Sequence, residues 1–451
     1  MTRFFTLLYA VISSFLLNAQ VTSGGGEFVP VHYEDNCLST ADRAAIQERL
    51  RISQHELMAA GKLTVSGDRE DVAFIWPLRK ADGFEWNSYY GISAHLDQNP
   101  TDGVLDYYDC GMRTYDGHRG TDIFTWPFPW YMVDNDLVEI IAGEAGVIIE
   151  KDDGFDDDHC ECFGSWNAVY VQHEDGSVAW YGHMKKGSLT DKEVGETVEQ
   201  GEFLGIVASS GCSTGPHLHL EVYDADVNLI DPYAGPCNEL NVDSWWLEQP
   251  ESREPTLNTI LTHDEVPEHG CPSINEDPHM QNDFYPGDNF YTALYFHDGV
   301  EGTEGEYELK MPDGTVWNSW DHTIGTTYNA SWWWWSWDLP DDGPFGVWTL
   351  EAEYEGQTIV HEFNYGVYAN IADDENRFIQ IWPNPSLDGN LNVFGAKLGT
   401  AVLIYDAAGK LLETQTLNKG ELLLSHLAKG VYFISLEREN GTKEINKWIK
   451  N

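Results

Sequence analysis

The chain has 451 residues, enough for two to four domains, and 42% of them are hydrophobic, enough for ordinary buried cores. It carries 75 acidic against 25 basic side chains, a formal net charge of -50. Such a surface repels nucleic acids and anionic membranes, so we expect neither as a partner. We interpret the acidity as a solvation property of the surface, because no complete EF-hand loop indicates a calcium-dependent fold.

Residues 1–19 have the pattern of a signal peptide. Arg3 precedes a short apolar run that ends at Leu17, and Ala19 is a small residue at the expected cleavage site. The run is too short for a membrane-spanning helix, and no other segment is apolar enough to span a bilayer. The mature protein is therefore expected to begin at Gln20 and to be exported.

Residues 20–70 are predicted to form an N-terminal helical segment. Ser39 and Asp42 have the spacing of a capping box, and Gly61 is a natural stop. Apolar residues lie between them with a rough helical spacing, at Ile46, Leu50 and Leu57. From its position alone, this segment is also a candidate for a removable inhibitor.

The remaining chain is predicted to be mostly β. In residues 71–248, short apolar runs alternate with Gly, Asp and Asn turns, which is typical of an all-β domain with long loops. The clearest strands are expected at 146–149, 168–172, 178–181 and 218–222. Residues 256–370 alternate in the same way and are predicted to form an immunoglobulin-like β-sandwich.

Within the second β region, Trp332, Trp333, Trp334 and Trp335 follow one another, with Trp337 close by. Alternate residues of a strand face opposite sides of a sheet, so these tryptophans divide between two faces. We expect core and edge packing. The alternative is an exposed aromatic row on one face that stacks against carbohydrate or peptide.

The last module, residues 379–451, differs in charge from the rest of the chain. Residues 380–451 contain 8 Lys and Arg and 7 Asp and Glu, so the preceding residues carry the whole negative excess. A shift of this size marks a separate domain, and its short apolar runs predict a small β-sandwich.

Seven cysteines are expected to be mostly paired in an exported protein, with at least one left free because their number is odd. The sequence does not reveal which cysteines pair. His159, Cys160 and Cys162 lie in an acidic insertion at 151–163 and form a less favoured candidate for a second metal site. Its acidic stretch, 151–158, is expected to be a solvated loop, and the alternative is that the stretch borders the substrate groove.

Five residues of the first β region carry the chemistry: His118, Asp122, His183, His217 and His219. His118 and Asp122 are an even number of residues apart, as are His217 and His219. On extended segments each pair therefore faces one side, and Leu218 and Leu220 anchor the second strand in the core. Together the five offer two imidazoles and a carboxylate for a metal, with two imidazoles to spare.

This set of donors is typical of an open metal site that activates water. Three protein ligands leave a fourth position for a water, whose pKa a bound zinc ion lowers from about 16 towards 7. An imidazole that titrates near neutral pH can take the proton and return it to a leaving amine. The pattern therefore predicts a hydrolase.

The three phrases His118-Arg-Gly-Thr-Asp122, Tyr181-Gly-His183 and Gly215-Pro-His217-Leu-His219 resemble the M23 metallopeptidases of the lysostaphin/LytM type, whose fold is an antiparallel β domain. The resemblance covers roughly residues 76–233. It implies one Zn2+ per peptidase domain, held by His118, Asp122 and His219, with His183 and His217 as the catalytic pair. It also implies peptide substrates, chiefly the cross-links of bacterial peptidoglycan, and in some members glycine-rich proteins such as elastin.

The tail is similar to the type IX secretion sorting domain of Bacteroidetes, through Pro383-Asn-Pro385, Ile404-Tyr-Asp406 and Lys429-Gly-Val-Tyr432. This resemblance implies export to the cell surface or the medium, with the type IX secretion machinery as a partner. The leading hypothesis is a secreted zinc endopeptidase that acts on peptidoglycan. The alternatives are an extracellular protease for glycine-rich protein and a non-catalytic, zinc-containing binding protein at the cell surface.

Overall fold

The computed structural model describes residues 20–28, 38–66, 72–271, 275–341, 343–366, 379–382, 384, 386, 389–394, 396–418, 420–437 and 443–450. The signal peptide expected at 1–19 lies outside the described residues. By its internal contacts the chain divides into two compact units. The first contains residues 1–282, 287–341 and 348–363, and the second contains 283–286, 342–347 and 364–451.

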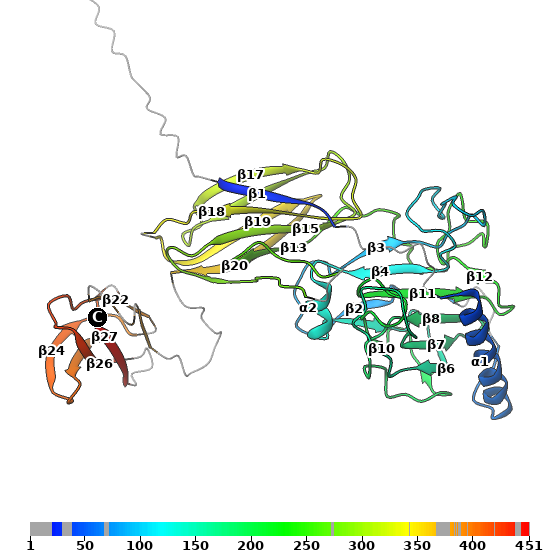
Figure 1. Cartoon of the computed structure of the whole chain (residues 1–451), viewed down its shortest axis with the longest axis horizontal. Helices are drawn as coiled ribbons and strands as arrows, with labels where there is room; N and C mark the ends of the chain where they lie inside the picture. Colours follow the sequence, from blue (N-terminus) through cyan, green and yellow to red (C-terminus); the bar gives the residue numbers. More distant parts are fainter. Residues whose placement is uncertain are drawn as a thin grey trace, which may run out of the picture. The chain divides into compact units, whose positions relative to one another are not determined.

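An eight-stranded antiparallel sheet is the frame of the central β domain, and its strand order is β3-β4-β11-β8-β7-β6-β9, with β12 paired to β11 (Figure 1). The strands predicted near 146–149, 168–172, 178–181 and 218–222 are all present. The bounds of the eight are β3 Tyr90–Ala94, β4 Thr121–Thr125, β6 Gly146–Asp152, β7 Ala168–Gln172, β8 Val178–Gly182, β9 Thr197–Val198, β11 His217–Tyr223 and β12 Leu229–Ile230.

A second, three-stranded sheet covers one face of this frame and has the order β10-β5-β2, with β2 Leu78–Lys80, β5 Val138–Ile141 and β10 Phe203–Ile206. One continuous core joins the two sheets. Ile140 and Leu204 of the small sheet and Leu218 and Leu220 of β11 are all fully buried in it. The short helix α2, Pro129–Asp134, was not expected from the sequence, since six residues are too few for a helical period to be recognised.

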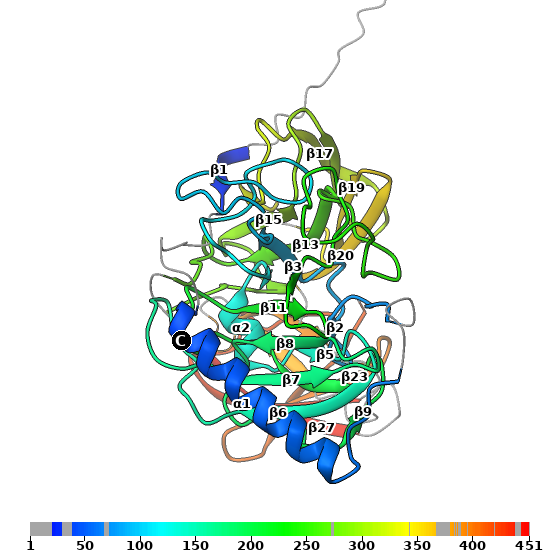
Figure 2. The ribbon, with the colours of Figure 1, turned by 90° about the vertical axis from the view of Figure 1, so that its right-hand side faces the viewer.

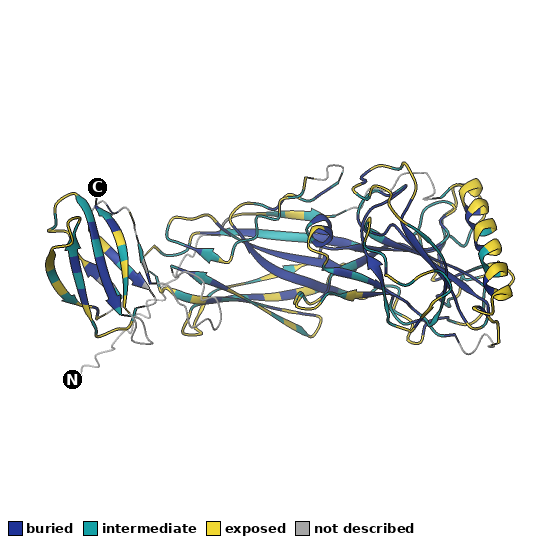
Figure 3. Cartoon of the chain, turned by 90° about the horizontal axis from the view of Figure 1, so that it is seen from below, coloured by how far each residue is buried: buried dark blue, intermediate teal, exposed yellow. Residues whose placement is uncertain are grey.

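Helix α1, Thr40–Ala59, covers the other face of the frame and confirms the predicted helix. Ser39 is its N-cap, and the Ser39 side chain accepts a hydrogen bond from the backbone N–H of Asp42. Figure 2 shows α1 lying along β6 and β7. Its apolar stripe packs against Ile149, Trp166 and Trp180, while its outer face is exposed (Figure 3). Packing of this stripe, more than helix propensity, holds α1 in place.

Residues 20–27 are a strand, β1, and in this part the predicted helical segment is wrong. β1 pairs in antiparallel fashion with β18, Ala330–Trp337, and forms an edge of the second β region. A Cβ on Gly25 would lie 2.2 Å from the carbonyl oxygen of Trp332, so only glycine permits this close approach. The pairing is set by a partner more than 300 residues away, which local sequence cannot reveal.

The second β region contains two sheets. One has the order β1-β18-β15-β13, and the other has the order β14-β20-β19-β16-β17. Aromatic side chains fill the space between the two sheets, including Phe296 against Tyr354 and Trp335 against Trp320. The remaining bounds are β13 Thr256–His263, β14 Asp283–Phe284, β15 Phe290–His297, β16 Glu304–Lys310, β17 Val316–Thr323, β19 Gly346–Tyr354 and β20 Gln357–Tyr365.

The tryptophan row lies on β18, and its members alternate between the two faces of the sheet. Trp333 and Trp335 contact His322 of β17, on the side of the second sheet. Trp332 contacts His269 and Tyr295 on the opposite side. All the tryptophans of β18 are buried or partly buried, so the row serves packing, and the structure gives no support to an exposed stacking platform.

The second β region packs against the central domain and is covalently linked to it. Phe124, Trp126 and Phe128 share an apolar cluster with Tyr295 and neighbouring residues of the sandwich. Arg113 forms a buried ion pair with Asp298. A disulfide joins Cys160 of the central domain to Cys271. The two regions therefore form one packed body. The segment that connects them, 249–255, is held in place by contacts such as the hydrogen bond from Arg113 to the carbonyl of Ser252.

The second unit contains the C-terminal module, which has a three-stranded and a four-stranded sheet with the orders β21-β22-β25 and β24-β23-β26-β27. Its own core includes Val402, Ile404, Ile434 and Trp448. Pro383 and Pro385 of the expected motif lie outside the described residues. The bounds are β21 Gln380–Trp382, β22 Asn390–Phe394, β23 Ala401–Asp406, β24 Leu411–Thr416, β25 Glu421–Leu423, β26 Gly430–Glu437 and β27 Lys443–Lys450.

Among the described residues, no helix is both long enough and apolar enough to cross a membrane.

Candidate metal centre

The register of three neighbouring strands brings the candidate ligands together. β11 lies between β4 and β8, and His219 of β11 pairs directly with Asp122 of β4 on one side and with Gly182 of β8 on the other. The residue after Gly182 is His183. The Asp122 carboxylate and the His219 imidazole therefore lie side by side across the sheet. The loop that carries the His183 imidazole begins next to them.

His118 belongs to the same group of residues, but it does not lie on the extended strand that was predicted. It does not lie on a strand with Asp122, because β4 begins only at Thr121 and residues 116–117 form a turn. The even spacing is therefore not what aligns the two side chains. The turn folds His118 back towards the strand, so that its Nε2 lies 3.2 Å from Asp122 Oδ2.

His118, Asp122 and His219 offer ligand atoms that all lie within 4.8 Å of one another, and all three residues are buried. The outer ring nitrogens of the two histidines are already engaged. His118 Nδ1 donates to the carbonyl of His95 at 2.8 Å, and His219 Nε2 lies 3.0 Å from a carboxylate oxygen of Glu221. His118 Nε2 and His219 Nδ1 are thereby left for a metal, and two imidazoles with one carboxylate suit zinc.

The two remaining histidines lie beside this group. The rings of His183 and His217 have centroids 4.3 Å apart. His183 Nδ1 donates to the carbonyl of Ser210 at 2.6 Å, and His217 Nδ1 donates to the carbonyl of Gly215 at 2.8 Å. The Nε2 atom of His183 is buried without a hydrogen-bond partner among the described residues. His217 Nε2 lies 3.7 Å from Asp122 Oδ1.

The local electrostatics favour neutral imidazoles around an ionised carboxylate. Burial lowers the pKa of His183 well below its usual range, and His217 and His219 lower it further. Burial also lowers the pKa of His217, with Asp122 opposing the shift. Burial alone would raise the pKa of Asp122, but the surrounding histidines hold it well below its usual range. Neutral histidine and ionised aspartate are the forms that bind a metal.

Several residues that support the centre were not predicted. Glu221 holds His219, and its position two residues along β11 gives it the same strand parity as both histidines, a signal that the sequence did contain. Tyr115 stacks on His118 with ring centroids 4.2 Å apart, and its hydroxyl lies 3.3 Å from Asp122 Oδ2. Trp166 contacts both His183 and His219. No spacing rule connects Tyr115 or Trp166 to the ligands.

Gly182 must be glycine because of Trp166. A Cβ at this position would lie 2.3 Å from the indole ring. The following residue, His183, has a φ of 64°, which is uncommon outside glycine. The chain turns sharply there, and the pair Gly182 and His183 directs the imidazole towards His217.

A groove of about 780 Å³ lies next to Trp166. We call it the α1 groove, because one wall is the start of α1, including Ser39, Asp42 and Arg49. The other wall is the acidic insertion, with Phe155 and Phe163. Both phenylalanines are exposed. Trp166 lines the groove and also contacts His183 and His219. The insertion thus borders a groove, and the use of this groove by a substrate stays a prediction.

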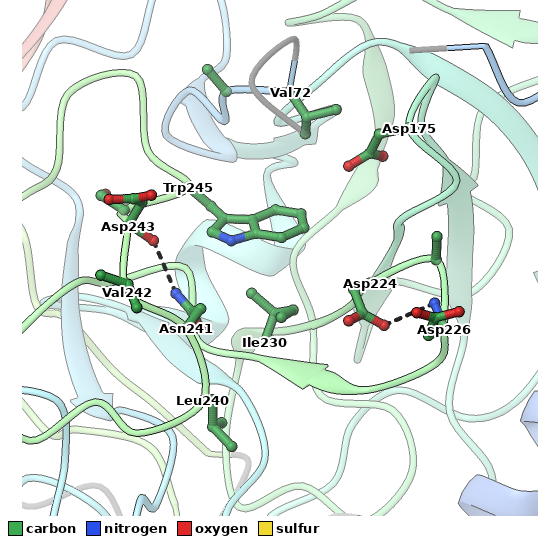
Figure 4. A pocket seen from close by; sticks show the side chains of 13 residues that line it. Val72, Asp175, Asp224, Asp226, Ile230, Leu240, Asn241, Val242, Asp243 and Trp245 are labelled. Atoms are coloured by element: carbon green, nitrogen blue, oxygen red, sulfur yellow. Dashed lines mark hydrogen bonds between the residues drawn. The ribbon is translucent and has the colours of Figure 1, made fainter. Parts of the chain in front are cut away.

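A second hollow, of about 640 Å³, is lined by Asp175, Asp224, Asp226, Asp243 and Trp245 among others (Figure 4). Asp224 follows the last residue of β11, whereas the candidate ligand His219 lies near the first. At roughly 3.3 Å per residue, this places the hollow about 17 Å along the strand from His219. It is therefore separate from the metal centre.

Three disulfides are present among the described residues: Cys110–Cys237, Cys160–Cys271 and Cys162–Cys212. The alternative of a second metal site at His159, Cys160 and Cys162 is therefore wrong, because both sulfurs are bonded and His159 Nδ1 donates to the carbonyl of Gly211. The seventh cysteine, Cys37, lies outside the described residues.

Comparison with known proteins identifies two regions of the chain. Residues 129–232 match peptidase family M23. The chain carries an M23 peptidase domain. The matched range contains His183, His217 and His219, and the structure adds His118 and Asp122 from the segment that precedes it.

Two relatives of this M23 domain are the DD-carboxypeptidase/endopeptidases Mpg of Neisseria meningitidis serogroup B and Neisseria gonorrhoeae, each 40% identical over 65 residues. The match covers 14% of this chain and 14% of each relative, so the chain spans only a small part of their length. A zinc-containing peptidase from Vibrio cholerae is 20% identical and superimposes with a TM-score of 0.23, covering 38% of this chain and 41% of that chain.

Residues 380–451 match a secretion system C-terminal sorting domain. The M23 domain is thus joined, in one chain, to a sorting domain of type IX secretion, which supports export to the cell surface or beyond.

Proposed function

We propose that this protein is a zinc metalloendopeptidase that hydrolyses peptide bonds in the cross-links of bacterial peptidoglycan. The observation that carries the proposal is the convergence of a buried His–Asp–His group and a second pair of histidines within one M23 domain. His118 and His219 each direct one ring nitrogen into the group, and Asp122 adds a carboxylate.

When bound, a zinc ion would lower the pKa of a water in its open fourth position and polarise the substrate carbonyl. The chain's own residues then accept the proton of this water and donate it to the leaving group. In their neutral forms both His183 and His217 donate through Nδ1, so both Nε2 atoms are acceptors. The His217 side chain is 12% exposed whereas His183 is fully buried, so a proton on His217 costs less desolvation. His217 is therefore the better acceptor of the water's proton and the donor to the leaving amine.

His183 is suited to the other task, which is to accept a hydrogen bond from the attacking water and orient it, because its Nε2 is an acceptor. Its ring is fixed by the carbonyl of Ser210 and by contact with Trp166, and it is shielded from solvent. A fixed acceptor in a buried site holds the water in the geometry that attack requires. In our proposal His183 and His217 therefore act as a pair.

The substrate assignment rests on the M23 match and on relatives that are named as carboxypeptidases and endopeptidases of the DD type. Export through the type IX machinery would bring the enzyme to walls other than that of its own cell. The α1 groove is the candidate path for the peptide, because Trp166, which lines it, contacts His183 and His219.

The test is to incubate the full chain with purified peptidoglycan and, separately, with elastin, and to measure released amines with and without a chelator. Chelator-sensitive release from peptidoglycan supports the proposal. Release from elastin alone would make the protein a protease for glycine-rich protein. Full occupancy by zinc with no release from either substrate would favour a binding protein. The His219→Ala variant controls for contaminating peptidases.

A further inference from the structure

A buried chain of polar contacts connects a candidate metal ligand to the N-terminal helix. His219 Nε2 lies 3.0 Å from Glu221 Oε2, and the Glu221 side chain has no solvent exposure. Arg43 of α1 donates from Nε to both oxygens of that carboxylate, at 3.0 and 3.3 Å, and from Nη2 at 3.3 Å. Tyr223 donates its hydroxyl to the other oxygen, Oε1.

Arg43 is itself fixed. It lies at the end of the first turn of α1, where its backbone N–H donates to the carbonyl of the N-cap Ser39, and its side chain is 8% exposed. The guanidinium also donates to the carbonyl of Leu38. Ile46 and Leu50, one and two turns further on, anchor the helix in the apolar cluster that contains Trp166. The position of the guanidinium therefore follows from the docking of the whole helix.

We propose that Arg43 is a positioning residue for the metal ligand His219, acting through Glu221, and that helix α1 is a structural part of the metal centre. This inference rests on the proposed function, since it assumes that His219 binds zinc. It goes beyond the family match, because Arg43 lies outside residues 129–232. It also opposes the hypothesis that the N-terminal segment is a removable inhibitor.

The physical argument is the role of a carboxylate behind a ligating histidine. Such a partner fixes the tautomer and the ring orientation, and its loss typically weakens metal binding 10- to 100-fold. Glu221 can perform this role only while its charge is compensated, because a buried carboxylate without its ion pair is strongly unfavourable. Arg43 is the buried cation that compensates this charge. Arg119 Nε lies 3.6 Å from Glu221 Oε1, but the Arg119 side chain is 38% exposed and therefore compensates the charge less.

Geometry also explains why arginine is required. The guanidinium presents several N–H groups in one plane and can contact both carboxylate oxygens at once, whereas a lysine ammonium is a point charge. We therefore expect Arg43→Lys to retain the charge and lose the orientation. Arg49, on the same helix, is the matched control, because it pairs with Asp152 and does not contact Glu221.

The experiment compares the full chain with Arg43→Gln, Arg43→Lys and Arg49→Gln. The dissociation constant for zinc is measured by competition with a chromophoric chelator, and the visible spectrum is recorded after substitution with cobalt. We expect zinc binding about 10-fold weaker in Arg43→Gln, an intermediate value in Arg43→Lys and a value within about twofold of the parent in Arg49→Gln. The cobalt spectrum should change in the two Arg43 variants only.

A purely structural role for Arg43 would lower the melting temperature of the metal-free protein but leave zinc affinity and the cobalt spectrum unchanged, and that result would overturn the inference. If Arg43→Gln does not fold, Arg43→Lys provides the same comparison. A parent protein that binds no zinc would refute the proposed function itself, and the inference with it. A parent that binds zinc, with Arg43 variants of equal affinity, would refute the inference alone.

Discussion

His183 and His217 lie with their rings 4.3 Å apart because the end of β8 and the start of β11 are neighbours in one antiparallel sheet. Gly182, the last residue of β8, pairs with His219, so the residue that follows it emerges beside His217. The two short phrases of the sequence that contain these histidines are thus brought together by strand register. The same register places Asp122 of β4 opposite His219.

This register depends on close packing at Gly182. We expect Gly182→Ala to lower the melting temperature by several degrees and to weaken zinc binding, because the added Cβ would meet the Trp166 indole at 2.3 Å. Thermal unfolding and zinc titration check this. The control is Gly325→Ala, where a Cβ would meet nothing within 4 Å. Equal behaviour of the two variants would show that the site tolerates the clash.

The α1 groove leads to a prediction about substrate binding. Phe163 is 57% exposed at the wall of the groove and has no evident role in the core. We expect Phe163→Ala to raise KM several-fold and to change kcat little, because a contact made equally in the ground and transition states affects binding alone. Steady-state kinetics on a soluble peptidoglycan fragment give the measurement. A large fall in kcat with unchanged KM would place the peptide elsewhere.

Asp231 leads to a prediction about how the stability of the fold depends on pH. It is fully buried, and burial raises its pKa to about 7, although hydrogen bonds from the Tyr233 backbone and Gln98 oppose the shift. The folded protein therefore holds this proton more tightly than the unfolded chain. The resulting stabilisation is complete below the ordinary pKa, near 4, and is lost as the pH rises through about 7.

We expect Asp231→Asn to match the parent in melting temperature near pH 5 and to exceed it near pH 8, since asparagine stays neutral throughout. The measurement is the difference in melting temperature between variant and parent across this range. Asp243→Asn, at an exposed position, is the control. A difference that does not vary with pH would mean that Asp231 does not titrate in this range.

The disulfide Cys160–Cys271 leads to a prediction about the tether between the central domain and the sandwich. Replacing both cysteines by serine should lower the melting temperature, because a bond between residues 111 positions apart stabilises by about 2–4 kcal/mol. Zinc affinity should change little, since neither cysteine is among the candidate ligands. Scanning calorimetry and zinc titration test the two halves of this expectation, and an unchanged melting temperature would refute the first.

The parts of the site that the sequence predicted are those encoded locally. His217, Leu218, His219 and Leu220 alternate on one strand, so their division between groove and core follows from a period of two. The helix from 40 to 59 was predictable because its cap and stripe are also local. Such local patterns can be recognised without knowing which strands pair with one another.

What escaped prediction depends on distant partners. Strand β1 is rich in glycine, which disfavours strands, and it forms because β18 offers an edge for pairing. The contact of Arg43 with Glu221 joins residues 178 positions apart. His118 was assigned to the right group on an incorrect premise, since a turn and not a strand presents it. Only the tertiary fold specifies these relationships.

We propose that five residues form one hydrolytic centre, in which three bind zinc and two accept and donate protons. The most direct test measures bound zinc and peptidoglycan hydrolysis on the same samples of the full chain, His219→Ala, His183→Ala and His217→Ala. We predict that His219→Ala loses both, whereas His183→Ala and His217→Ala retain zinc and lose about 100-fold or more in hydrolysis. Hydrolysis at the parent rate by His183→Ala and His217→Ala, or by a His219→Ala protein without zinc, would contradict the account.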